Sequence, residues 1–158
     1  MMKKRDLEDR AYLLRRKRVD DKSRYNQIQK RLVNDSEIIF TTLSSAGSER
    51  LEKYKGQFAC LIVDEAGQCT EPNLLIALQL NIPKVLLIGD PCQLPATTFS
   101  PDSNITLFNR SMFERMIDGG LRPYFLDIQY RMTPQIRYFP SKCFYNARLT
   151  DDYSVRTR

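Results

Sequence analysis

The stretch CLIVDEAGQ, residues 60–68, decides the fold class because an apolar run ends in two adjacent carboxylates. Residues 60–63 favour a buried strand, and Asp64 and Glu65 follow at its carboxyl end. In an open parallel sheet, ligands bind beyond the carboxyl ends of the strands. Paired acids at that edge are typical of nucleoside triphosphate hydrolysis, in which one carboxylate serves Mg²⁺ and the other orients or deprotonates water. A strand that merely ends in two surface acids is the alternative.

Length and composition limit the classes of protein to which the chain can belong. With 158 residues, of which 42% are apolar, it has room for one core and a fraction of a second domain. No segment reaches the roughly 20 apolar residues of a membrane span, and the N-terminus lacks the apolar part of a signal peptide. Four cysteines without a C-x-x-C pair, and no histidine, argue against a zinc site, a disulfide framework and a Ser-His or Cys-His nucleophile. We expect a reducing, intracellular compartment.

The positive charge is concentrated at the beginning of the chain. Residues 1–35 hold twelve Lys or Arg and six Asp or Glu, whereas the remaining 123 residues hold thirteen of each, so the whole net charge of +6 lies in the first segment. A basic segment of this kind is typical of proteins that bind the phosphate backbone of nucleic acid, RNA included. A solvated helix face is the alternative.

The pattern of residues predicts an α/β chain with a helical beginning. Residues 1–46 contain neither Gly nor Pro, and two helical pieces around a charged middle favour a helical hairpin or stalk over 1–36. Strands are predicted at 37–43, 60–63, 84–90 and 123–130, a loop at 44–48, a helical turn at 49–55, and helices at 71–80, 111–118 and from 133 to a break at Pro140. The repeated order of strand, acid and helix predicts a parallel sheet with right-handed crossovers.

Three segments occur in an order that resembles a known family. DEAGQ (64–68), GDPCQLP (89–95) and QYRM (129–132) are similar to the second, third and fourth motifs of superfamily 1 RNA/DNA helicases, and most of all to the senataxin-type branch, relatives of the nonsense-mediated-decay helicase. TTLSSAG (41–47) resembles that branch's nucleic-acid-contacting loop, and FPSKCFY (139–145) the run after its fourth motif.

The resemblance implies a fold and a division into domains. The fold would be a truncated RecA-like parallel sheet of the P-loop NTPase type, preceded by a helical stalk. Residues 1–36 would form the basic stalk, 37–122 the C-terminal part of a first RecA-like domain, and 123–158 the start of a second.

The resemblance also implies roles at the nucleotide, with ATP and Mg²⁺ as cofactors. Asp64 would hold Mg²⁺, through water, because this ion keeps much of its hydration shell. Glu65 would polarise the attacking water, and Gln68 would sense the nucleotide. Gln93 would bind the γ-phosphate or the attacking water. Asp90 would serve the nucleotide or hold the turn at the preceding glycine.

Arg131 would reach the γ-phosphate as an arginine finger, a group whose removal costs roughly 10³–10⁵ in rate in comparable systems. A surface salt bridge is the alternative for this residue.

A second set of residues would contact nucleic acid, which is single-stranded RNA or DNA or an RNA–DNA hybrid. These residues are Thr41, Thr42, Ser44, Pro95 and Thr97. Their contacts would go to backbone phosphates and be largely independent of sequence. Hydroxyls in such loops are equally suited to capping a local turn.

The sequence departs from the family pattern in one major respect. No stretch reads G-x-x-x-x-G-K-[ST], so the loop and lysine that cradle phosphates are not found; in the family they lie upstream of the stalk. The resemblance therefore implies a segment of an ATP-dependent helicase that does not hydrolyse ATP alone, with a nuclear location by analogy. A non-catalytic nucleic-acid-binding or interaction module is the alternative. Gly67 stands where relatives often carry Ala or Thr.

Overall fold

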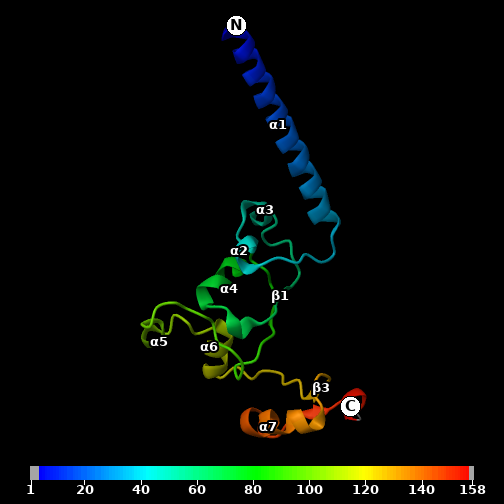
Figure 1. Cartoon of the computed structure of the whole chain (residues 1–158), viewed down its shortest axis with the longest axis vertical. Helices are drawn as coiled ribbons and strands as arrows, with labels where there is room; N and C mark the ends of the chain where they lie inside the picture. The colour runs from blue at the N-terminus through cyan, green and yellow to red at the C-terminus, as the bar shows by residue number, and fades with distance from the viewer. Residues whose placement is uncertain (1–3, 157–158) are drawn as a thin grey trace. The chain divides into compact units, whose positions relative to one another are not determined.

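The chain begins with one long helix. The computed structural model describes residues 4–156, and the side chains of residues 12, 15, 17 and 21–156. Helix α1 runs without interruption over Lys4–Asp35, 32 residues, in agreement with the absence of Gly and Pro (Figure 1). The alternative of a helical hairpin is therefore wrong. The chain divides into two units after Thr41, and each is described by itself.

The segment 37–43 does not form the predicted strand. Residues 38–42 form no helix or strand, and Ile38 and Phe40 are 72% and 92% exposed. An apolar run becomes a strand only if another strand pairs with it, and the described ladders join other segments. The predicted loop at 44–48 is also wrong, because Leu43–Ala46 forms helix α2 with Thr42 as its cap.

The second unit contains the parallel strands that the sequence predicts. Strand β1 (Leu61–Val63) pairs with β2 (Val85–Leu87) in parallel, with Ile62 opposite Leu86. Between them lie the 3₁₀ helix η1 (Ala66–Gln68) and helix α4 (Glu71–Leu78), and helix α3 (Glu49–Glu52) precedes them. The strand predicted to be buried before Asp64 is buried at Val63, but Ile62 is 61% exposed, and Leu86 of β2 is 50% exposed.

Two small clusters of buried side chains hold this unit together. One consists of Val63, Ala66, Leu74 and Met112 and joins β1, η1, α4 and helix α6 (Met112–Asp118). The other consists of Ala46, Leu51, Ala77 and Leu80. Because α4 contributes side chains to both clusters, it fixes the position of the turn after β1 relative to helix α2.

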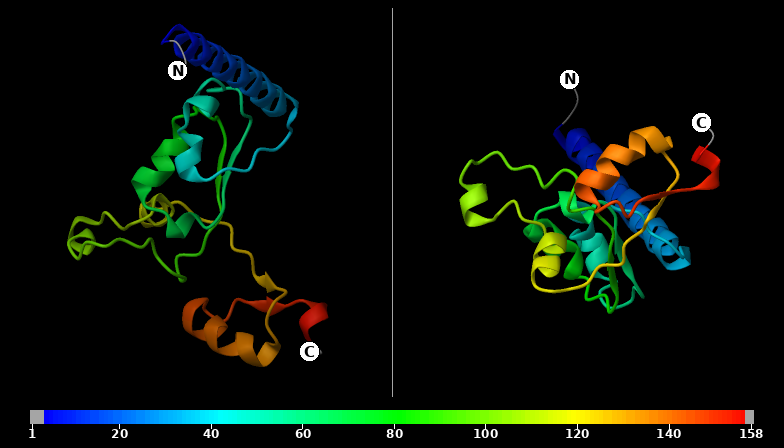
Figure 2. Two further views of the ribbon diagram at one scale, coloured as in Figure 1. Left: turned by 45° about the horizontal axis from the view of Figure 1, so that its top comes forward. Right: turned by 90° about the horizontal axis from the view of Figure 1, so that it is seen from below.

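The helix ends follow the predicted signals in most places. Ser111 caps α6 by accepting a hydrogen bond from the Glu114 amide, and Gly119 ends the helix. Thr70 occupies the cap position of α4, although its side chain makes no capping bond. Before α6, a long loop carries the short helix α5 (Ser103–Thr106) (Figure 2).

The last part of the chain packs one helix beside a short parallel pair. Strands β3 (Ile128–Gln129) and β4 (Thr150–Asp151) form the pair, and helix α8 (Tyr153–Arg156) follows. Helix α7 (Pro134–Phe144) runs through Pro140, so the predicted break is wrong. Buried Ser141 anchors the turn after α7: its carbonyl accepts from the Tyr145 and Ala147 amides, and its hydroxyl from the Leu149 amide. In residues 4–156, no helix combines the length and apolarity of a membrane span.

Candidate functional site

The two carboxylates after β1 lie in one tight turn. Asp64 Oδ1 accepts a 3.0 Å hydrogen bond from the Glu65 amide, and Gln68 Nε2 donates a 3.0 Å bond to Glu65 Oε2. Glu65 has φ 52° and ψ 39°, a left-handed conformation that costs a residue with a Cβ roughly 1–2 kcal/mol. Both carboxylates are exposed. The strained turn therefore holds two acids and an amide in solvent at the carboxyl end of β1.

The turn after β2 is locked against the turn after β1. The Ile88 amide donates to Val63 O at 2.8 Å, and the Ala66 amide donates to Ile88 O at 2.7 Å. At Gly89 the two backbones approach so closely that a Cβ atom would lie 2.9 Å from the Gly67 nitrogen. The second and third motifs thus form one rigid edge, as parallel strands with short ends require.

Asp90 accepts hydrogen bonds from three donors at this edge. Its Oδ1 accepts from the Cys92 amide at 2.9 Å, and its Oδ2 accepts from Gln93 Nε2 at 2.8 Å and from the Tyr145 hydroxyl at 2.6 Å. Burial raises the pKa of Asp90, but the bonds from Tyr145, Gln93 and Cys92 outweigh it and leave the pKa below its ordinary value. Burial and the same carboxylate raise the pKa of Tyr145 to about 12. Asp90 is therefore an ionised acceptor at neutral pH.

The site suits hydrated Mg²⁺ better than a naked ion. Among the described residues, no group of three or more His, Cys, Asp or Glu side chains could hold a metal ion. The Glu65 amide donates to Asp64 Oδ1, and no described residue donates a hydrogen bond to Asp64 Oδ2. An exposed carboxylate with one unused oxygen fits an ion that keeps its water and takes few protein ligands. For the triphosphate of ATP, residues 1–158 contain no glycine-rich loop with a lysine.

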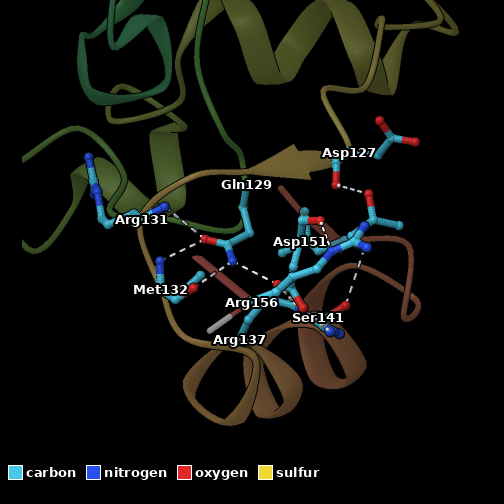
Figure 3. A network of polar contacts seen from close by, with 10 residues as sticks. Asp127, Gln129, Arg131, Met132, Arg137, Ser141, Asp151 and Arg156 are labelled. Carbon is cyan, nitrogen blue, oxygen red and sulfur yellow. Dashed lines mark hydrogen bonds and ion pairs between the residues drawn. The ribbon is translucent and has the colours of Figure 1, made fainter. Parts of the chain in front are cut away.

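The motif around Arg131 is organised by the half-buried side-chain amide of Gln129. Gln129 Nε2 donates to Met132 O and to Asp151 Oδ1, both at 2.7 Å, while its Oε1 accepts from the amides of Arg131 at 3.0 Å and Met132 at 2.7 Å (Figure 3). Arg137 binds Asp151 through both Nε and Nη2, at 3.0 and 2.7 Å. These bonds from Arg137 and Gln129 lower the pKa of Asp151 to about 2.

The Arg131 side chain itself is exposed. Its guanidinium makes no hydrogen bond or ion pair with any described side chain. The alternative, that Arg131 forms a surface salt bridge, is therefore not observed among the described residues. None of the hydrogen bonds among the described residues joins it to Asp64, Glu65 or Gln93. The network of Gln129 fixes the backbone of Arg131 and leaves the cation in solvent.

The residues assigned to nucleic acid fall into two separate groups. Thr42 caps α2, accepting from the Ser45 amide at 3.2 Å and donating to its hydroxyl at 3.0 Å, while Ser44 is exposed and Thr41 ends the first unit. Pro95 and Thr97 line a hollow of about 380 Å³ formed by the loop that carries α5. Asp64, Glu65 and Asp90 are not among the residues that line this hollow.

Comparison with known proteins places the chain in a family. Two family models, each described as an AAA domain, match residues 2–101 and 108–158. The chain belongs to the AAA-domain helicases. Since helicases of both the senataxin and the nonsense-mediated-decay type are among its relatives, the resemblance to superfamily 1 is confirmed.

Three relatives illustrate the match. The chain is 41% identical over 133 residues to "Probable helicase MAGATAMA 3" of Arabidopsis thaliana, covering 84% of this chain and 16% of the relative. It is 42% identical over 116 residues to "Helicase SEN1" of Saccharomyces cerevisiae, covering 73% and 5%. It is 35% identical over 130 residues to "ATP-dependent helicase upf1" of Schizosaccharomyces pombe, covering 82% and 14%. The chain therefore spans a small part of each of these relatives.

Sequence reasoning missed several residues of this region. Tyr145 lies in FPSKCFY and Gln129 in QYRM, but the family resemblance assigns a role to neither residue. Nothing in the local pattern singles out Arg137 and Asp151, because their ion pair and its link to Gln129 join different elements.

Proposed function

We propose that the chain is a segment of an ATP-dependent RNA/DNA helicase that couples ATP hydrolysis to unwinding or translocation. Residues 37–122 would form the C-terminal part of a first RecA-like domain, 123–158 the start of a second, and 1–36 a basic stalk. The observation that carries the proposal is the locked edge at which the turns of Asp64 and Asp90 meet, because ligands of parallel sheets bind there.

Each residue of this edge contributes a defined group. Asp64 would take one water-bridged position of Mg²⁺, an ion that when bound neutralises phosphate charge. Glu65, held by Gln68, offers a carboxylate to orient and deprotonate a water molecule. Gln93 offers an amide oxygen to the same water, while Arg131 supplies an unpaired cation for phosphate charge.

The nucleic-acid partner would be single-stranded RNA or DNA, or an RNA–DNA hybrid. The surplus of six positive charges in residues 1–35 supplies attraction to phosphates. Thr41, Thr42, Ser44, Pro95 and Thr97 would add sequence-independent backbone contacts, with Thr42 doing so while it caps α2. The chain matches both "Helicase SEN1" and "ATP-dependent helicase upf1". Membership of the senataxin-type branch and a nuclear location are therefore further parts of this proposal.

The experiment that tests the proposal measures binding of a labelled single-stranded RNA by fluorescence anisotropy, with and without Mg²⁺ and ATP, over a series of salt concentrations. We expect salt-sensitive binding that changes on adding Mg²⁺ and ATP, and no hydrolysis by the isolated chain. Replacing exposed Arg15, Lys17, Lys22 and Arg24 by Gln is expected to flatten the slope of log K against log salt by up to about 3, since each phosphate contact contributes about 0.7. The control is Lys53→Gln with Lys55→Gln, two exposed residues that follow α3.

The second candidate is a non-catalytic module that binds nucleic acid, favoured by the surplus of six positive charges in residues 1–35. It predicts the same salt dependence but no response to Mg²⁺ and ATP. An immunoblot against residues 58–68 separates the two further: a product far above 18.5 kDa supports the helicase segment, and one near 18.5 kDa the module.

A further inference from the structure

We infer that Tyr145 is a positioning residue for Gln93, acting through Asp90. The inference rests on the proposed role of Gln93 at the nucleotide. The Tyr145 hydroxyl donates to Asp90 Oδ2 at 2.6 Å, and Gln93 Nε2 donates to the same oxygen at 2.8 Å. A phenol 52 residues further along the chain than Gln93 thus shares an acceptor atom with it.

The shared acceptor determines which way the Gln93 amide faces. A carboxylate only accepts hydrogen bonds, so the amide nitrogen, and not the oxygen, must point toward Asp90. No described donor reaches Gln93 Oε1, and the side chain is exposed. The oxygen therefore faces away from Asp90, available to accept a bond from water.

The hydroxyl of Tyr145 holds Asp90 in the rotamer that makes this possible. Asp90 Oδ1 is tied to its own turn through the Cys92 amide, whereas Oδ2 is fixed from outside the turn by the phenol. A second contact joins the same segments, since Cys92 Sγ lies 3.5 Å from the carbonyl oxygen of Phe144. The end of α7 therefore acts directly on the loop of the third motif.

Tyr145 is itself held in place by its ring. The ring centroid lies 6.2 Å from that of Phe125 and 6.5 Å from that of Phe144, in tilted and edge-on arrangements. These ring contacts do not need the hydroxyl. Tyr145→Phe consequently removes the hydrogen bond to Asp90 and keeps the packing, which separates positioning from a structural role.

The test follows the side-chain amide of Gln93 and the backbone amide of Cys92 by ¹H–¹⁵N NMR in the whole chain without nucleotide. Both resonances are expected to shift in Tyr145→Phe by more than in the control Tyr138→Phe, a residue of α7 that is 61% exposed. Tyr145→Leu, which also removes the ring, is expected to shift them at least as far. In an Asp90→Ala background, which removes the shared carboxylate, Tyr145→Phe is expected to add nothing to the Gln93 shift.

The NMR shifts of the variants distinguish a positioning role of the Tyr145 hydroxyl from a packing role of its ring. If Tyr145→Phe leaves both resonances where they are and only Tyr145→Leu moves them, Tyr145 is a packing residue and the inference is overturned. An additional shift in the Asp90→Ala background overturns it as well, because the effect would then bypass the Asp90 carboxylate. Adding Mg²⁺ and ATP to the wild-type chain tests the proposed function separately: a Gln93 amide that does not respond contradicts that function without altering the reading of the variants.

Discussion

Gly89 packs against Gly67 so tightly that a Cβ atom at position 89 would lie 2.9 Å from the Gly67 nitrogen and 3.2 Å from the nitrogen of Ala66. Both neighbours are backbone atoms, and the Ala66 amide is already committed to Ile88 O at 2.7 Å. The third motif therefore needs glycine at this position for space. The second motif has more room, because a Cβ at Gly67 would lie 3.4 Å from Asp90 O.

We expect Gly89→Ala to lower the free energy of unfolding by about 1–3 kcal/mol, the range for overpacking a tight contact. Gly67→Ala, its matched control, is expected to cost clearly less. Urea unfolding followed by circular dichroism measures both. Equal losses in the two variants would mean that the contact between the turns does not determine the stability of this edge.

Ser111 provides a second test, on the start of α6. Its buried hydroxyl accepts the Glu114 amide at 3.1 Å, so Ser111→Ala is expected to lower the free energy of unfolding by about 1 kcal/mol, within a range of 0.5–2. Thr133 occupies the same position on α7 without a side-chain capping bond, and Thr133→Ala is expected to cost less. The same urea series compares them, and a larger loss from Thr133→Ala would contradict the capping argument.

Local signals were sufficient for the elements around the carboxylates. The runs before Asp64 and Asp90 predict strands that the structure has as a parallel pair, and the Ser111 cap and Gly119 stop bound α6 as expected. The positions of these strands and the ends of α6 depend on residues within one strand or one turn, whereas the pairing joins residues 24 positions apart, such as Ile62 and Leu86. Local patterns can therefore encode the strand positions and the helix ends fully.

The predictions that failed needed a partner that no local pattern specifies. Residues 37–43 have the composition of a strand, but no described strand pairs with them, and Thr42 caps a helix instead. Pro140 lies inside α7, which continues to Phe144, and the bonds that buried Ser141 accepts from residues 145, 147 and 149 form only at and beyond the end of this helix. The bond between Tyr145 and Asp90 joins residues 55 positions apart. Such contacts depend on the tertiary arrangement.

The ion pair of Arg137 and Asp151 predicts a specific loss of stability in acid. Asp151 has its pKa lowered from 3.8 to about 2 in the folded chain, chiefly by the bonds from Arg137 and then Gln129. A carboxyl whose pKa falls on folding stabilises the fold above its unfolded pKa, and this stabilisation disappears as the pH falls through the folded value. Its contribution is therefore complete above about pH 5 and is lost between pH 3.8 and about 2.

Arg137→Gln is expected to reduce the stability at pH 7 and to flatten its decline across that acid range. Lys142→Gln, on the same helix but exposed and outside the pair, is expected to leave the decline unchanged. Urea midpoints measured between pH 2.5 and 7 provide the comparison. A decline of equal slope in Arg137→Gln and the wild type would show that Asp151 is not the carboxyl responsible.

Arg131 and Gln129 are neighbours in one motif with opposite expected roles. Since the exposed guanidinium of Arg131 has no partner among the described side chains, Arg131→Ala is expected to change the free energy of unfolding by less than about 0.5 kcal/mol. In the wild type, Asp151 Oδ1 and Met132 O each lie 2.7 Å from the amide nitrogen of Gln129, which donates to both. Gln129→Glu places a carboxylate oxygen against these two acceptors. We expect this variant to lose about 1–3 kcal/mol at pH 7, because both acceptors lose their donor.

The pH dependence of Gln129→Glu distinguishes this cause from a general loss of packing. Beside Asp151 the new carboxyl would have its pKa raised on folding, and such a group stabilises the fold below its unfolded pKa and loses that effect as the pH rises through the folded value. Part of the lost stability is therefore expected to return as the pH falls from 7 toward 5, in contrast to Gln129→Leu, which cannot ionise. If Arg131→Ala proves as destabilising as Gln129→Glu, the guanidinium supports the fold and is not held free for phosphate charge.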